Sequence, residues 1–124
     1  MASFGEQLRQ FAEKTEADLE LVDRKFKLDL FSDVILRTRV DTGRMRGNWQ
    51  VTTGAPARNE LKRTRKRATT LAPADIAKIE AFSSTFLTNN VPYVRIWEER
   101  DGMVGGAIAR ARQILDEAVR DAGT

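Results

Sequence analysis

The sequence predicts a single α+β domain in which a long N-terminal helix and a C-terminal helix pack on a small antiparallel sheet. Three observations predict this fold class: helical apolar periodicity at both ends of the chain, two short β-rich segments between them, and turn residues that separate these parts. The chain has 124 residues and a mass of 14.0 kDa, which suits one domain with one modest core.

Residues 1–39 are expected to form the long helix. Ser3 and Glu6 have the spacing of a capping box, and no proline occurs between Phe4 and Arg39. Apolar residues recur along one face at steps of three, four or their sums. They are Phe4, Leu8, Phe11, Leu19, Val22, Phe26, Leu30 and Val34.

The second half of this helix carries a further apolar row, formed by Leu21, Leu28, Phe31 and Ile35. A helix of about 35 residues would measure about 52 Å, whereas a compact globule of this chain length is only about 35 Å across. The helix therefore either bends and packs wholly on its own core, or projects beyond the domain and needs a partner. We favour the second reading and expect these four residues to form an oligomer interface.

The centre of the chain begins with a turn and a strand, residues 40–56. Residues 40–43 have turn chemistry, and residues 48–53 alternate in polarity and are rich in Trp, Val and Thr. Residues 57–72 show no period, so they are expected to form a mobile basic loop.

Residues 73–102 are expected to hold a short helix, a strand and a turn. Pro73 suits the first turn of a helix over residues 74–81, and residues 83–88 have strand composition. Because Pro92 excludes a central strand, residues 93–97 form either a helical turn or an edge strand. The turn Asp101-Gly102 then leads into the C-terminal helix, residues 103–124.

The composition argues against a conventional enzyme. The chain has no cysteine and no histidine, which excludes disulfides, thiolate metal sites and imidazole general bases. The sequence shows no stretch of about 20 apolar residues that could span a bilayer, and its first eleven residues lack the apolar run of a signal peptide. We therefore expect no membrane association and assembly in the cytoplasm.

The positive charge is concentrated in one segment. The net charge is +3, but residues 58–67 hold six basic residues and one acidic residue, Glu60. Such a block can contact phosphates or an acidic protein, or it can be a solvated loop. It has no aromatic residue for base stacking, which disfavours a single-strand platform. The candidate contact residues are Arg58, Lys62, Arg63, Arg65, Lys66 and Arg67.

Two further patterns could carry chemistry. Asp41-Thr42-Gly43 matches the aspartic-protease tripeptide, but that mechanism needs two carboxylates and an apolar strand context. A capped turn opened by Gly43 is the simpler interpretation. Glu98, Glu99 and Asp101 could hold Mg²⁺ or Ca²⁺, yet Arg95 and Arg100 lie beside them in the sequence and favour a solvated, ion-paired turn. We expect neither a metal nor a cofactor.

Two segments resemble a known family. Residues 40–49, VDTGRMRGNW, are similar to the DTGRLRGSW segment of the neck, or tail-completion, proteins of long-tailed bacteriophages, the minor tail protein Z-like family. Residues 86–94, FLTNNVPYV, followed by Trp97-Glu98 and residues 102–104, are similar to the family's ITNNLPYA…LE(Y/F)G…GMV pattern. The chain departs from it after Glu98, where Glu99 and Arg100 replace an aromatic residue and a glycine.

The resemblance implies a virion structural protein without catalysis. It implies a homo-oligomeric ring, with six copies as the expected number, that joins tail to head and meets head-completion or connector and tail-terminator proteins. The basic loop would then face packaged DNA or a protein neighbour. The alternative from the residues alone is a small nucleic-acid-binding protein.

A structural role follows for the residues of the two motifs. We expect the turn to be capped by Thr42 and both tryptophans to be buried between sheet and helices. The motif residues are Asp41, Thr42, Gly43, Arg44, Trp49, Asn89, Pro92, Tyr93 and Trp97.

Overall fold

The computed structural model describes residues 3–123, with the side chains of residues 11, 12, 17, 122 and 123 outside the description. It confirms the α+β class. The elements in chain order are α1 (Phe4–Leu36), α2 (Arg44–Gly47), β1 (Trp49–Thr53), α3 (Pro73–Ile76), β2 (Thr85–Asn89), α4 (Val94–Asp101), α5 (Met103–Ala109) and α6 (Ala111–Gly123).

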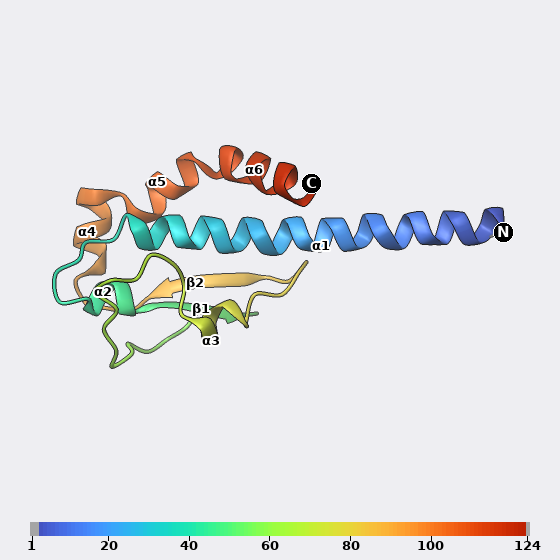
Figure 1. Ribbon diagram of the computed structural model, residues 1–124. Coiled ribbons are helices and arrows are strands. Elements are labelled where there is room, and N and C mark those ends of the chain that lie inside the picture. The colour runs from blue at the N-terminus through green and yellow to red at the C-terminus, as the bar shows by residue number, and fades with distance from the viewer. Residues whose placement is uncertain (1–2, 124) are drawn as a thin grey trace.

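The long helix α1 forms the middle of the molecule. Helices α5 and α6 run along one side of it, and the sheet with α2 and α3 lies on the other side (Figure 1). An ion pair of 2.8 Å between Arg110 and Asp33 fixes the first layer to α1. On the second side, Lys27 donates hydrogen bonds to the carbonyls of Glu80 and Ser83, at 2.9 and 3.0 Å.

This central position corrects our interpretation of the second apolar row. Phe31 is 9% exposed and Ile35 is fully buried, and both belong to the core. Helix α1 is apolar on two sides here because it is covered by two layers, so these two residues do not form an oligomer interface. Leu21 is exposed and Leu28 is half-buried, so both can still contact a partner.

Helix α1 is one continuous helix of 33 residues, about 50 Å long. Its N-terminus is capped as expected, because the Ser3 hydroxyl accepts a hydrogen bond of 3.2 Å from the Glu6 amide. It ends at Leu36, three residues before the expected end. The Thr38 hydroxyl there donates to the Val34 carbonyl at 2.7 Å, and the Thr38 amide bonds to the Ile35 carbonyl.

The first part of α1 projects from the body, as Figure 1 shows. The end of α6 lies beside Lys25, which pairs with Asp121 at 3.5 Å. On the N-terminal side of Lys25, the side chains of Phe4, Leu8 and Leu19 are 76%, 53% and 55% exposed. The reading of a helix bent onto its own core is therefore wrong. Phe11, which belongs to the same row in the sequence, has a side chain outside the described part.

The sheet consists of β1 and β2 in antiparallel register, with Trp49 opposite Asn89 and Val51 opposite Leu87. Trp49 and Val51 alternate with half-buried Gln50 and Thr52, so one face of β1 enters the core. Both strands lie within about two residues of the expected ranges.

The C-terminal region differs from the expected single helix. Two helices, α5 and α6, are separated at Arg110, whose amide bonds to the Ala107 carbonyl at 3.0 Å. Residues 93–97 lead into helix α4, so the edge-strand alternative is wrong. The short helix α3 is four residues long and ends at Ile76, before the expected Ala81. Among the described residues, no helix combines the length and apolarity needed to cross a membrane.

Candidate assembly surface

The two sequence motifs lie together in space although more than 35 residues separate them. Strand β1 continues the first motif and pairs with β2, which carries the second. The Asn89 side-chain nitrogen donates to the Met45 carbonyl at 2.8 Å, and its side-chain oxygen accepts from the Val91 backbone amide at 3.2 Å. A cleft of about 460 Å³ beside this contact is lined by both motifs, including Asp41, Thr42, Tyr93 and Trp97.

The turn before α2 differs in part from the expected cap, because the N-cap residue is Gly43 and no side chain caps the helix. The Thr42 hydroxyl accepts a hydrogen bond of 3.2 Å from the Arg44 amide. Gly43 has φ 84°, in the left-handed region. A Cβ atom at this position would also lie 2.6 Å from the backbone nitrogen of Lys66. Glycine is therefore required at this position for two reasons, namely the left-handed dihedral angle and the close approach of the basic loop.

Gly47 provides a second close approach between the turn and the basic loop. A Cβ atom there would lie 2.6 Å from the Arg63 carbonyl oxygen. Next to it, the Asn48 side-chain oxygen accepts from the Leu61 amide at 2.6 Å, and its nitrogen donates to the Arg44 carbonyl at 2.8 Å. The basic loop is irregular, as expected, and these contacts hold it against α2.

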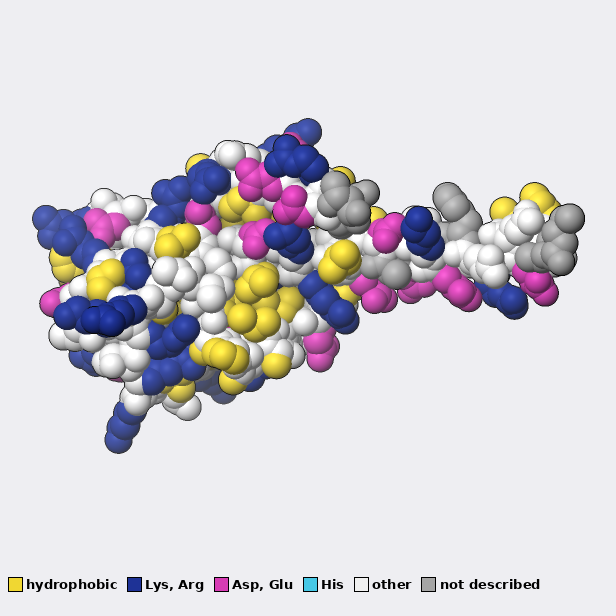
Figure 2. All heavy atoms as spheres, in the orientation of Figure 1, with side chains coloured by type: hydrophobic (Ala, Val, Ile, Leu, Met, Phe, Trp, Pro, Cys, Tyr) yellow, Lys and Arg dark blue, Asp and Glu magenta, His cyan; other side chains and the backbone are white. Residues whose placement is uncertain are grey.

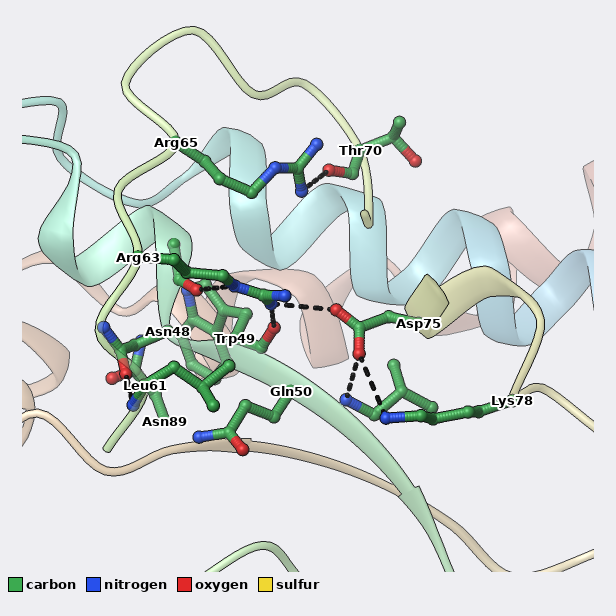
Figure 3. Close-up of polar contacts among 12 residues, drawn as sticks. Asn48, Trp49, Gln50, Leu61, Arg63, Arg65, Thr70, Asp75, Lys78 and Asn89 are labelled. Carbon is green, nitrogen blue, oxygen red and sulfur yellow. Dashed lines mark hydrogen bonds and ion pairs between the residues drawn. The ribbon is translucent and has the colours of Figure 1, made fainter. Parts of the chain in front are cut away.

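Arg63 is the centre of this attachment (Figure 3). Its guanidinium donates to the carbonyls of Gly47 and Trp49, the latter at 3.0 Å, and to the Asp75 carboxylate at 2.9 Å. Asp75 is 3% exposed and also faces the Val51 amide at 3.5 Å and Lys78 at 3.9 Å. Arg63 therefore has a structural role, and the same holds for Arg65, which donates to the Thr70 carbonyl at 2.9 Å.

The other four cations of the block differ from these two. Arg58, Lys62, Lys66 and Arg67 are exposed, and their side chains make no ion pair or hydrogen bond within residues 3–123. They are the part of the basic loop that is available to an external anion. The structure thus divides the six candidate contact residues into two that support the fold and four that face solvent.

Arg44 links both motifs to the basic loop. Its guanidinium forms an ion pair with Glu60 at 2.7 Å and lies 5.3 Å from the centre of the Tyr93 ring. The hydrogen bond from Arg44 lowers the pKa of Glu60, and Glu60 in turn raises the pKa of Arg44. The acidic residue of the basic block is therefore already paired within the chain.

Trp49 and Trp97 have different surroundings. Trp49 is 4% exposed, and its indole nitrogen donates to the Thr38 hydroxyl at 2.9 Å. Trp97 is only half-buried, so its expected burial is wrong. Its ring lies under Arg39 at 4.1 Å and near Arg100 at 5.4 Å. The ring packs against the core cluster and also lines the cleft, where Arg39 covers it.

Two of the three acidic residues of α4, Glu98 and Asp101, bind other parts of the fold, whereas Glu99 is exposed. Glu98 accepts hydrogen bonds from the amides of Val104 and Gly105, at 2.8 and 3.1 Å, and Asp101 pairs with Arg39 at 2.6 Å. No cluster of three metal-ligating side chains occurs among the described residues. Asp41 is exposed at the rim of the cleft, and none of the other lining residues is a carboxylate that could share a proton with it.

Several residues of this surface were not identified from the sequence. Asp75 is the main one, since nothing in residues 73–76 indicates a buried carboxylate. Arg46 donates to the carbonyls of Thr38 and Ala68, at 2.8 and 2.6 Å, and so joins the end of α1 to the basic loop. Arg46 lies within the first motif, but its position in the sequence does not show that its contacts differ from those of Arg44.

Comparison of the chain with protein-family models, with curated proteins and with solved structures found no match.

Proposed function

We propose that this chain is a structural subunit of the neck of a long-tailed bacteriophage. In this proposal, several copies form a ring at the head–tail junction, join the tail to the DNA-filled head and surround the DNA channel. The supporting observation is that the two segments resembling the tail-completion family form one contiguous surface, held by the β1–β2 pairing and by the bond from Asn89 to Met45.

The projecting part of α1 supports assembly. Phe4, Leu8 and Leu19 lie on a helix that leaves the body and are all more than half exposed. An isolated monomer gains little from such a row in water, whereas a subunit of a larger assembly can bury it.

The basic loop supports a position near DNA. Its four solvent-facing cations can neutralise phosphates without disturbing the fold, because other residues, among them Arg63 and Arg65, hold the loop in place. In the proposed ring these four cations face the channel or an acidic neck protein. The neighbours would be head-completion or connector proteins on one side and a tail terminator on the other, and the role is architectural and not catalytic.

The exposed cations also favour one alternative, a small nucleic-acid-binding protein. The two functions predict different particle masses in solution and different binding to free duplex DNA. A ring subunit assembles by itself, whereas a binding protein of this kind remains a monomer and binds duplex DNA with an affinity that falls steeply with salt.

Light scattering and negative-stain imaging of the full chain test the proposal. We expect particles with a central opening and a mass that is a multiple of 14.0 kDa, with six copies giving about 84 kDa. A monomer at all concentrations that binds free duplex DNA would instead support the alternative. The variant Arg58→Ser separates the two further, because it should weaken DNA binding without changing the mass of a ring.

A further inference from the structure

The projecting part of α1, residues 4–20, has a charge opposite to that of the rest of the molecule. We call it the arm. It holds five acidic and two basic residues, so its net charge is −3, and the remainder of the chain carries +6. An anionic helix is repelled by nucleic acid and by anionic membranes, and it is attracted to the body of another copy of this chain.

The monomer also exposes more surface than its mass requires. Its accessible surface is 8192 Å², whereas a compact monomer of this mass exposes about 6,700 Å². The excess of about 1,500 Å² is close to the total area, about 1,600 Å², that a standard protein–protein interface buries. Each partner contributes about 800 Å² of that area, so the surplus on one copy corresponds to two contact faces, as a subunit with a neighbour on either side has.

An apolar groove lies on the body at the base of the arm. It has a volume of about 320 Å³ and lies between α1 and residues 76–79. Figure 2 shows hydrophobic side chains gathered where the arm leaves the body. Leu21 and Ile76 are 51% and 37% exposed at its surface. The lining residues are Leu21, Arg24, Lys25, Leu28, Ile76 and Ile79.

We propose that the arm of one copy docks into this groove on a second copy, with Phe4 and Leu8 against the leucine and isoleucine side chains. This inference rests on the proposed ring and names the surfaces that would build it. The exposed cation Arg24 at the groove attracts the acidic arm, and the apolar side chains of both surfaces leave water. Because arm and groove are different surfaces, the contact is head-to-tail, and such a contact closes into a ring when its rotation permits.

Disulfide trapping tests this contact directly, because the chain has no cysteine of its own. In one copy, position 8 lies 13 residues before Leu21 on the same helix, about 20 Å from the groove. A disulfide needs Cα atoms about 4.4–6.8 Å apart, so positions 8 and 76 can be joined only between copies. In the double variant Leu8→Cys/Ile76→Cys we expect oxidation to give covalent multiples of 14.0 kDa on a non-reducing gel.

Two controls make the result specific. Leu8→Cys/Ile108→Cys places the second cysteine on α5, at a side chain that is 61% exposed but outside the groove. Leu8→Cys alone reports arm–arm contact. We expect both to give at least tenfold less cross-linked product than the groove pair. Equal cross-linking in a control, or none in the groove pair, would overturn the proposal.

A charge variant gives an independent readout by light scattering. Leu8→Asp should reduce the chain to monomers, whereas Gln10→Asp, which adds the same charge to the opposite face of the arm, should leave the oligomer intact. Rings that persist in Leu8→Asp would overturn the docking proposal and leave the ring proposal standing. Arm-to-groove cross-links in a chain that forms no ring would support the docking proposal and overturn the ring proposal.

Discussion

Arg63 and Asp75 together occupy the outer edge of β1, joined by an ion pair of 2.9 Å. Arg63 donates to the Trp49 carbonyl and Asp75 accepts from the Val51 amide, so two side chains satisfy backbone groups that a third strand would otherwise satisfy. In this way a cation of the basic block is attached to the edge of the sheet. This attachment explains why the basic loop lies so close to the turn before α2.

Removing one partner of this pair should destabilise the fold strongly. Arg63→Ala leaves the Asp75 carboxylate, whose side chain is 4% exposed, without its main partner. Loss of one member of a buried ion pair costs about 3–5 kcal/mol. Arg67→Ala, in the same loop but exposed, should change the free energy of unfolding by less than about 0.5 kcal/mol. Chemical denaturation measures both, and similar midpoints for the two variants would contradict the structural role of Arg63.

The turn glycines allow dihedral strain to be separated from close approach. Gly43 and Gly54 have similar φ angles, 84° and 87°, but a Cβ atom meets the Lys66 backbone at Gly43 and nothing within 4 Å at Gly54. Gly54→Ala should therefore cost only the strain of the left-handed conformation, about 1–2 kcal/mol. Gly43→Ala should cost clearly more by thermal unfolding, and an equal loss would show that the loop is not held against the turn.

The two tryptophans should differ in their contribution to stability. Trp49→Ala removes a buried ring and its bond to Thr38, so a loss of about 3–5 kcal/mol is expected. Trp97→Ala removes a half-buried ring stacked under Arg39 and should cost less. Thermal unfolding of both variants checks this order. A larger loss for Trp97 would place it in the core after all.

The ion pair between Arg44 and Glu60 gives a pH prediction. Because Arg44 lowers the pKa of Glu60 below its ordinary 4.5, the pair contributes stability above that value. This contribution is lost as the pH falls through the lowered pKa. In Arg44→Gln the pKa of Glu60 should rise toward 4.5, as followed by carboxyl NMR titration, while Arg58→Gln should leave it unchanged. An unaltered Glu60 pKa in Arg44→Gln would show that the pair does not form in solution.

The four solvent-facing cations should be dispensable for folding. Replacing Arg58, Lys62, Lys66 and Arg67 with serine leaves the contacts of Arg63 and Arg65 intact, so the melting temperature should stay close to that of the unmodified chain. If the chain is the proposed neck subunit, phage particles built with this variant should show altered DNA retention or fail to join head and tail. Infectious particles with normal DNA content would exclude both roles for the loop.

The fold class and most element positions could be predicted from local patterns. The capping box at Ser3, the periodicity of α1 and the alternation of residues 49–53 all depend on neighbours in sequence. The burial of Phe31 and Ile35 could not be predicted, because a helix that is apolar on two sides fits a three-layer core as well as an oligomer interface. The roles of Arg63 and Asp75 depend on tertiary contacts 12 residues apart, and no local pattern marks them.

Imaging of phage particles that incorporate this chain decides whether it is a neck subunit. We expect ring-shaped density at the junction between head and tail, around the DNA channel, into which copies of the structure of residues 3–123 fit with each arm on the next subunit. Absence of the chain from the neck, or density there that accommodates no ring of this subunit, would overturn the proposed function.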